Sequence, residues 1–124
     1  MQLADLNKLL NSELTTKING SLIENNELLL NIDPKNLHSV LLFLKGNTQC
    51  KFKQLIDIVP ADYPNEEKRF KIYYLLLSHE NNSRIKISIT FNIEEKIPSI
   101  TKIYPSANWM EREAFDMYGI KFKN

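Results

Sequence analysis

Two apolar segments separated by a short polar loop constrain the fold more than any other feature of the sequence. Residues 70–77 are apolar on both alternating faces, with Lys71 as their only charge, which predicts a central strand covered on both sides. Residues 79–83 form a polar loop. In residues 84–91 apolar and polar side chains then alternate strictly, with the isoleucines and Phe91 on one face. This period of two predicts a strand with one buried face, so the segment is expected to be a β-hairpin within a sheet.

The first half of the chain supplies patterns that complete this sheet and cover it. Leucines at helical spacing predict an amphipathic helix over residues 3–17. Asn25-Asn26 lies between two apolar runs and predicts a hairpin turn, because asparagine tolerates positive φ. Asp33-Pro34 predicts the start of a second helix, with aspartate as its N-cap and proline at its first position. Residues 52–59 predict a strand that is closed by Pro60.

The C-terminal quarter predicts a last helix over residues 109–118. Asn108 followed by Glu111 has the spacing of a capping box, and Gly119 has the place of the glycine that ends a helix. Before it, Pro98 is expected to open a short helical turn. Together the elements predict an α+β fold of two layers in the order α-β-β-α-β-β-β-α, with helices packed on a mostly antiparallel sheet.

Length and composition exclude several classes of protein. A chain of 124 residues is too short for two independent cores, so residues 1–124 are expected to form a single domain. Sixteen basic and fifteen acidic residues leave a formal charge of +1, which argues against a dedicated nucleic-acid binder. Cys50 is the only cysteine and excludes an intrachain disulfide or a multi-cysteine metal site. No apolar run approaches the roughly 20 residues needed to span a bilayer.

The sequence offers little for catalysis. His38 and His79 stand alone without the spacing of a metal site. No phosphate-binding glycine loop and no nucleophile-elbow motif is present. Glu113 and Asp116 are three residues apart and share a helix face, so a small stand-alone hydrolase that uses them is one alternative function. A soluble binding module is another.

The arginines are a more specific signal. Only three of the sixteen basic residues are arginine, namely Arg69, Arg84 and Arg112. An arginine binds a carboxylate through a planar fork that lysine lacks. We therefore expect these three side chains to form specific, partly buried salt bridges, either within the domain or across an interface.

Large apolar side chains crowd the last predicted helix. Trp109, Phe115, Met117 and Tyr118 lie within about ten residues of each other, and some of them are expected in the core. Trp109 and Phe115 are six residues apart, which separates them by about 120° around the helix axis. One narrow stripe cannot hold both, so the helix is expected to lie between its own sheet and another surface.

The same segment carries a long motif. Residues 107–122 read Ala-Asn-Trp-Met-Glu-Arg-Glu-Ala-Phe-Asp-Met-Tyr-Gly-Ile-Lys-Phe. This stretch resembles the Trp-x-Glu-Arg-Glu-x-aromatic-Asp-Met-aromatic-Gly-Ile-x-Phe motif of the 30-kDa subunit of respiratory complex I, called NADH dehydrogenase subunit 9 in mitochondria and the C subunit in bacteria. The resemblance covers most of the chain, strongly from residue 52 onward and weakly before it. The residues that carry the resemblance, interpreted as interface or structural positions, are Asp57, Asp62, Tyr63, Arg69, Arg84, Trp109, Glu111, Arg112, Glu113, Asp116, Gly119 and Phe122.

The resemblance implies a core subunit in the peripheral arm of proton-translocating NADH:ubiquinone oxidoreductase. Such a subunit would scaffold the quinone-reducing module, with no catalytic residue, cofactor or metal on its own chain. FMN, iron–sulfur clusters and ubiquinone would be held by neighbouring subunits. The chief partner implied is the quinone-site subunit related to the large subunit of nickel–iron hydrogenase. The location implied is the matrix side of the mitochondrial inner membrane, with the cytoplasmic face of a bacterial plasma membrane as the alternative.

One departure from the family concerns the C-terminus. Members of the family usually continue past the Gly-Ile-x-Phe stretch with a His-Pro-containing segment, whereas this sequence ends at Asn124. Either the tail has been lost, or a separately encoded polypeptide supplies it close to residue 124.

An exposed apolar patch would distinguish an interface subunit from the hydrolase and binding-module alternatives.

Overall fold

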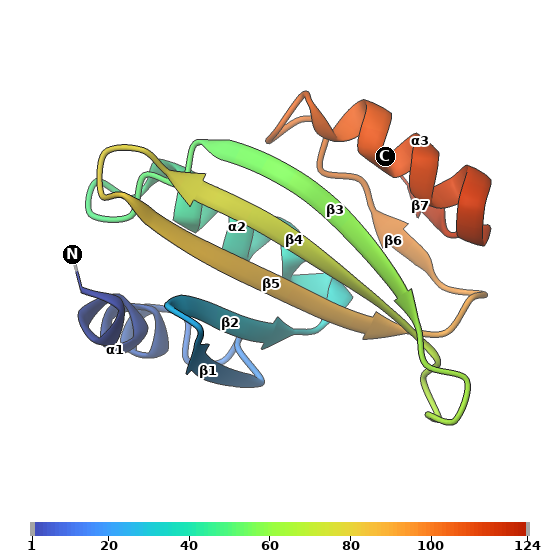
Figure 1. Cartoon of the computed structure of the whole chain (residues 1–124), viewed down its shortest axis with the longest axis horizontal. Coiled ribbons are helices and arrows are strands. Elements are labelled where there is room, and N and C mark those ends of the chain that lie inside the picture. Colours follow the sequence, from blue (N-terminus) through green and yellow to red (C-terminus); the bar gives the residue numbers. More distant parts are fainter. Residues whose placement is uncertain (1, 124) are drawn as a thin grey trace.

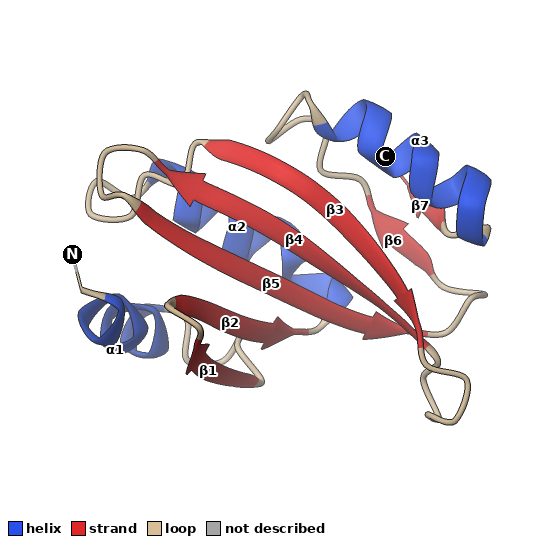
Figure 2. Cartoon of the chain, viewed as in Figure 1, coloured by secondary structure: helices blue, strands red, loops and turns tan. Residues whose placement is uncertain are grey.

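The computed structural model describes residues 2–123 of the chain (Figure 1, Figure 2). In chain order its elements are α1 (Leu3–Glu13), β1 (Gly20–Glu24), β2 (Glu27–Ile32), a 3₁₀ turn (Pro34–Asn36), α2 (Leu37–Gly46), β3 (Gln54–Asp62), β4 (Phe70–Ser78), β5 (Ser83–Phe91), β6 (Lys96–Pro98), α3 (Ala107–Tyr118) and β7 (Lys121–Lys123). The predicted order of an α+β fold is confirmed, and the short strands β6 and β7 are additions to it.

The main sheet has five strands in the order β1-β2-β5-β4-β3. All neighbouring strands are antiparallel except β2 and β5, which run parallel. The predicted hairpin is the β4–β5 pair, whose register continues from Phe70 opposite Phe91 to Ser78 opposite Ser83. The turn between β1 and β2 has φ of 52° and 66° at its two asparagines, as the sequence predicted. The sheet is therefore mostly antiparallel, which also confirms a prediction.

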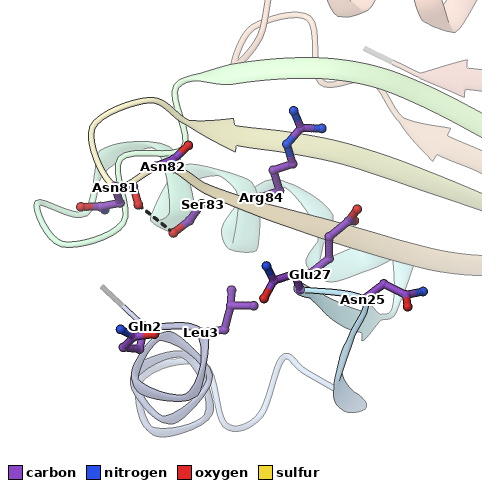
Figure 3. A pocket seen from close by; sticks show the side chains of 9 residues that line it. Gln2, Leu3, Asn25, Glu27, Asn81, Asn82, Ser83 and Arg84 are labelled. Carbon is purple, nitrogen blue, oxygen red and sulfur yellow. Dashed lines mark hydrogen bonds between the residues drawn. The ribbon is translucent and has the colours of Figure 1, made fainter.

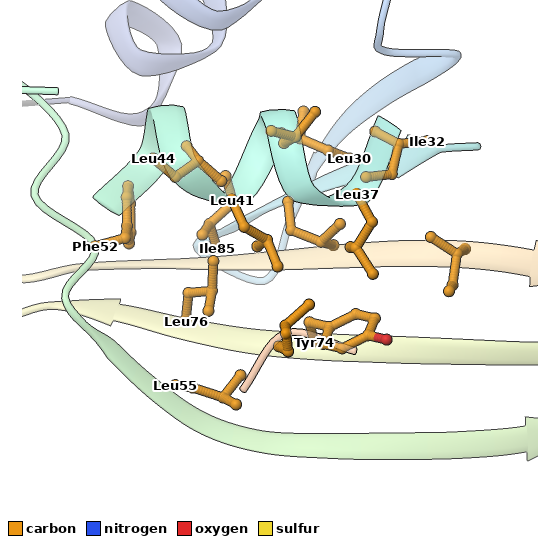
Figure 4. Close-up of a cluster of buried hydrophobic side chains, with 14 of the residues drawn as sticks. Leu30, Ile32, Leu37, Leu41, Leu44, Phe52, Leu55, Tyr74, Leu76 and Ile85 are labelled. Carbon is orange, nitrogen blue, oxygen red and sulfur yellow. The ribbon is translucent and has the colours of Figure 1, made fainter. Parts of the chain in front are cut away.

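The hydrophobic core lies between one face of the sheet and the helices. Helix α2 runs across that face, as Figure 1 and Figure 4 show, while α1 lies against β1 and β2. The alternating side chains predicted to face inward on β5 are all buried. Side chains that meet between α2 and the sheet include Leu37, Leu41, Leu44, Phe52, Leu55, Tyr74, Leu76 and Ile85. Burial of each such side chain adds about 1.5–3 kcal/mol to the free energy that favours folding. The conformational entropy lost when the side chain becomes ordered offsets part of this gain.

The opposite face of the sheet is not covered by any helix of residues 2–123 (Figure 1). The prediction that β4 is covered on both sides is therefore wrong. From Ile72 to Ser78 every second residue of β4 is buried, and the residues between them are half-buried. Neighbouring side chains shield part of this second face, since the ammonium groups of Lys71 and Lys86 lie 5.9 and 5.8 Å from the centre of the Tyr73 ring. Antiparallel sheets commonly have one such open face.

Two predicted element boundaries are wrong, namely the end of a strand at Pro60 and the N-cap of a helix at Asp33. Strand β3 does not stop at Pro60 but continues to Asp62. It is an edge strand that pairs only with β4, and an edge strand tolerates proline because its outer side needs no N–H donor. The Asp33 side chain does not cap α2. It accepts a hydrogen bond from Asn19 Nδ2 at 3.0 Å instead, and a 3₁₀ turn precedes the helix.

Candidate functional site: the outward face of the C-terminal helix

Helix α3 lies at the β3 edge of the sheet, away from α1 and α2 (Figure 1). Its C-terminus has the predicted form: Gly119 adopts the left-handed conformation with φ 72° and ψ 17°, and its N–H donates to the Phe115 carbonyl at 2.8 Å. This turn directs Ile120 into the core, where it is fully buried. The chain then continues into β7, which pairs in parallel with β6. Pro98 ends strand β6 and does not open the expected helical turn. The turn begins two residues later, where the N–H groups of Ile103 and Tyr104 donate to the Ile100 carbonyl at 3.0 and 2.9 Å.

The inward face of α3 has unusually small side chains. Its buried residues are Ala107, Glu111 and Ala114, and Met110 is half-buried against the core. The predicted capping box is wrong, because Asn108 lies within the helix and no side chain caps its first turn. The spacing suggested that Glu111 caps the helix, but its side chain binds another segment of the chain instead.

That contact is a buried carboxylate held by two donors. Glu111 accepts hydrogen bonds from Ser99 Oγ at 2.7 Å and from the Ile100 N–H at 2.8 Å. Burial raises the pKa of Glu111, while these two hydrogen bonds and the nearby charge of His38 act in the opposite direction. The His38 ring contacts the carbonyl oxygen of Ser99. The carboxylate thus joins α3 to the segment that follows β6.

A buried hydroxyl lies in the same part of the core. The Tyr74 side chain is fully buried in β4, and its hydroxyl has no hydrogen-bond partner within the part of the chain that the structure describes. Burial raises the pKa of Tyr74 well above its usual value, and the charge of Glu111 raises it further. Unlike this unpaired hydroxyl, Glu111 binds α3 to its surroundings through two hydrogen bonds.

The large apolar side chains of α3 point away from the core. The exposed fraction is 66% for Trp109, 53% for Phe115 and 74% for Met117, and Tyr118 is also exposed. The expectation that some of them lie in the core is wrong. We use the name outward face for the exposed residues of α3, which are Asn108, Trp109, Arg112, Glu113, Phe115, Asp116, Met117 and Tyr118.

This outward face surrounds more than half of the helix. At about 100° per residue, Phe115 and Met117 lie roughly 120° and 80° from Trp109, on opposite sides of it. Phe122 of β7 is half-buried and lines, together with Arg112 and Phe115, a shallow hollow of about 310 Å³ beside the helix. Clustered exposed apolar side chains of this size are typical of surfaces that bind another protein.

One of the three arginines forms the kind of ion pair that was predicted. Arg69 Nε and Nη2 donate to the two carboxylate oxygens of Asp62 at 2.6 and 2.8 Å, and this pairing lowers the pKa of Asp62. Arg69 is exposed, whereas Asp62 is half-buried. Arg84 and Arg112 are exposed and form no ion pair with a carboxylate of residues 2–123. The prediction of salt bridges within the domain therefore holds for Arg69 alone.

The remaining motif residues lie far from the outward face in the sequence and serve the sheet. Asp57 is in β3 and accepts a hydrogen bond from the N–H of Ile58 at 2.8 Å. The Tyr63 and Tyr73 hydroxyls lie 3.2 Å apart, and burial raises the pKa of Tyr73 to about 12. Arg84 lies near the start of β5. The motif residues thus do not converge on one site, since those of α3 and β7 form one group and the others lie in β3, in the loop between β3 and β4, and in β5.

The side chains considered for catalysis are exposed carboxylates and a buried thiol. Glu113 and Asp116 are both exposed, and no three side chains of His, Cys, Asp or Glu gather in that range as a metal site would require. Burial raises the pKa of the Cys50 thiol to about 11, which disfavours the reactive thiolate. None of the described helices is both long and apolar enough to cross a membrane.

A polar hollow of about 380 Å³ lies between the start of α1, the β1–β2 turn and the β4–β5 loop (Figure 3). Its lining is dominated by the amide side chains of both turns, together with Glu27 and Arg84. Ser83 is also present, and its hydroxyl donates to the Asn81 carbonyl at 3.1 Å. It has no histidine beside it in the lining, so this hollow lacks an activated nucleophile.

Comparison with known proteins shows the family to which the chain is related. The family model described as "Respiratory-chain NADH dehydrogenase, 30 Kd subunit" matches residues 30–124. The chain belongs to this family. It is 39% identical over 120 residues to the C subunit of NADH-quinone oxidoreductase from Mesorhizobium japonicum, covering 97% of this chain and 60% of that protein. With the same subunit from Xanthobacter autotrophicus it shares 42% identity over 120 residues, covering 97% and 57%. The chain therefore spans somewhat less than two thirds of the length of these relatives.

A solved structure supports the fold. The chain superposes with a TM-score of 0.85 and 19% identity on a chain in the structure of the membrane-bound sulfane sulfur reductase, an archaeal respiratory membrane complex. The superposition covers 100% of this chain and 72% of that one. At this identity the likeness concerns the architecture alone. The predicted resemblance to the 30-kDa subunit family is confirmed by the family model and by the sequence relatives.

Proposed function

We propose that this member of the 30-kDa family is a non-catalytic assembly subunit in the peripheral arm of NADH:quinone oxidoreductase, and that it binds its main partner through the outward face of α3. The observation that carries the proposal is the distribution of side chains on this helix. Two alanines face the core, whereas Trp109, Phe115 and Met117 face solvent. A soluble helix that folds alone places its apolar stripe inward. The reverse arrangement fits a helix whose second side is buried in a complex.

The partner that suits this surface is a protein with an apolar groove, because apolar side chains spread over more than 180° of a helix cannot all contact a flat surface. We assign this role to the quinone-site subunit related to the large subunit of nickel–iron hydrogenase, which the family resemblance names as the neighbour. FMN, iron–sulfur clusters and ubiquinone would then lie on other subunits, and this chain would fix the geometry of the quinone-reducing module.

The location follows from the proposed complex. Both relatives described above are bacterial proteins, so they support the cytoplasmic face of a bacterial plasma membrane, the alternative that the sequence left open. The mitochondrial matrix stays a prediction without such support. The expectation that a further segment adjoins residue 124 in the complex also stays a prediction.

Alanine substitutions on the outward face test the proposal. Trp109→Ala and Phe115→Ala should each weaken binding to the co-expressed quinone-site subunit by about 2 kcal/mol or more, roughly 30-fold, as aromatic hot spots do. The matched control is Leu42→Ala, because Leu42 is 58% exposed on α2, away from the outward face. All three variants should unfold at about the wild-type denaturant concentration, since exposed side chains add little to stability. Binding at wild-type affinity by both α3 variants would rule out this face as the docking surface.

A further inference from the structure

The orientation of α3 is not explained by hydrophobic burial. A helix on a protein surface is normally oriented by its apolar stripe, which leaves water as it packs. The inward face of α3 has two alanine methyl groups and the half-buried Met110, whereas larger apolar surfaces lie on Trp109, Phe115 and Met117. Burial alone would favour a rotation that brings one of those side chains inward. Another interaction must hold the helix in the observed rotation.

The contact that can do so is the buried Glu111 carboxylate. Its Oε1 accepts from Ser99 Oγ at 2.7 Å and its Oε2 accepts from the Ile100 N–H at 2.8 Å. Glu111 and Ser99 are only 6% and 7% exposed. Both donors belong to the segment just after β6, so both oxygens of one side chain are tied to the same backbone region. Two hydrogen bonds to one planar carboxylate fix the rotation of the helix as well as its position.

We infer that Glu111 is the positioning residue of the docking helix, whose carboxylate holds α3 in the rotation that leaves Trp109, Phe115 and Met117 outward. The inference deepens the proposed function and rests on it, because the face held outward is the one assigned to the partner. Glu111 itself would not touch the partner. It acts through the helix it orients.

Within residues 2–123, no other side chain of α3 forms a hydrogen bond to the segment after β6. The His38 ring from α2 contacts the Ser99 carbonyl oxygen, not the carboxylate. The Tyr74 hydroxyl from β4 is buried and lacks a partner in residues 2–123. On α3 itself, Arg112 and Glu113 are exposed. Loss of the carboxylate would therefore leave the Ile100 N–H without its acceptor, and the Ser99 hydroxyl with only the Thr101 hydroxyl, 3.2 Å away.

The chain contains its own reporter for a change in the orientation of α3. Trp109 is the single tryptophan of the sequence and lies on α3, so its fluorescence reports the environment of this helix alone. Acrylamide quenching of Trp109 measures how far the indole is exposed. Hydrogen exchange of peptides from residues 107–118 measures opening of α3, and exchange in residues 70–91 measures the stability of the β4–β5 hairpin.

The experiment compares the full-length wild type with Glu111→Ala, Glu111→Gln and the control Glu113→Gln, which removes the same charge from the exposed side of the same helix. Glu111→Ala should speed exchange in residues 107–118 at least about tenfold and change the quenching of Trp109, with less than about a twofold change in residues 70–91. Glu111→Gln keeps one acceptor oxygen and should give an intermediate effect. Glu113→Gln should match the wild type.

A double-mutant cycle with Ser99→Ala tests whether the hydrogen bond is the cause. Ser99→Ala alone should speed exchange in α3, and it should add little when Glu111 is already alanine. Equal acceleration in residues 107–118 and 70–91 would show a general loss of stability and overturn the inference, as would unchanged exchange of α3 in Glu111→Ala. If the alanine variant does not fold, Glu111→Gln decides by the same two readouts. These measurements need no partner, so a failure of partner binding with normal α3 exchange would count against the proposed function only.

Discussion

Replacement of Gly119 by valine tests whether the left-handed turn after α3 is needed to place the end of the chain. Gly119 has φ 72°, a conformation that is costly for a residue with a Cβ and most costly for a β-branched one. A Cβ built at this position meets no atom within 4 Å. The cost of the substitution is therefore conformational strain and not a steric clash with neighbouring residues.

The loss of stability in Gly119→Val depends on which of two structural responses costs less free energy. If valine keeps the left-handed conformation, the strain is about 1–2 kcal/mol. If the backbone relaxes, Ile120 leaves the core, where it is fully buried, at about 1.5–3 kcal/mol. The domain will follow whichever response costs less, so the free energy of unfolding should fall by about 1–2 kcal/mol.

The assay is equilibrium unfolding of the full-length chain in urea, with the midpoint and the slope fitted separately. The midpoint should fall for Gly119→Val and the slope should stay constant. Gly119→Asn is the matched control, because asparagine adopts the left-handed conformation more readily and should cost clearly less. An unchanged midpoint for valine, or equal losses for valine and asparagine, would refute the explanation by left-handed strain.

Three further outcomes are expected. Arg112→Lys should reduce the amount of assembled complex more than Lys102→Arg does, measured on native gels, because lysine cannot form a bidentate contact with a partner carboxylate; equal amounts would contradict this role for the arginine fork. Arg69 lowers the pKa of Asp62 from 3.8, so the ion pair stabilises the fold above that pH, and the contribution is lost as the pH falls through the lowered value. Unfolding of Asp62→Asn measured between pH 2 and pH 7 should lack this acid-dependent part. Cys50 is buried with its pKa raised to about 11, so iodoacetamide at pH 8 should label it only after denaturation, and rapid labelling of the folded chain would show that the thiol is accessible.

Features that depend on a few neighbouring residues could be predicted from the sequence. The alternation in β5, the asparagine turn between β1 and β2, and the glycine that ends α3 each reflect backbone preferences or a side-chain period that is visible locally. The family could be identified in the same way, because its motif in residues 107–122 is continuous. None of these inferences requires knowledge of which elements meet in space.

The errors arose where a residue's role depends on a distant part of the chain. Pro60 was expected to end a strand, yet it is tolerated because β3 lies at the edge of the sheet. Glu111 has the spacing of a capping residue, yet its carboxylate binds the segment after β6. The apolar residues of β4 predicted two covered faces, yet the helices of residues 2–123 cover only one.

For the candidate site, the order of residues is enough to establish which side chains the last helix carries and that one stripe cannot hold them all. Which of these side chains face the core depends on how the helix packs in the folded domain. Helical periodicity fixes the angles between Trp109, Phe115 and Glu111 around the axis, but it does not fix the rotation of the helix relative to the sheet. That rotation is set by contacts with the segment after β6, which place a carboxylate inward and the aromatic side chains outward.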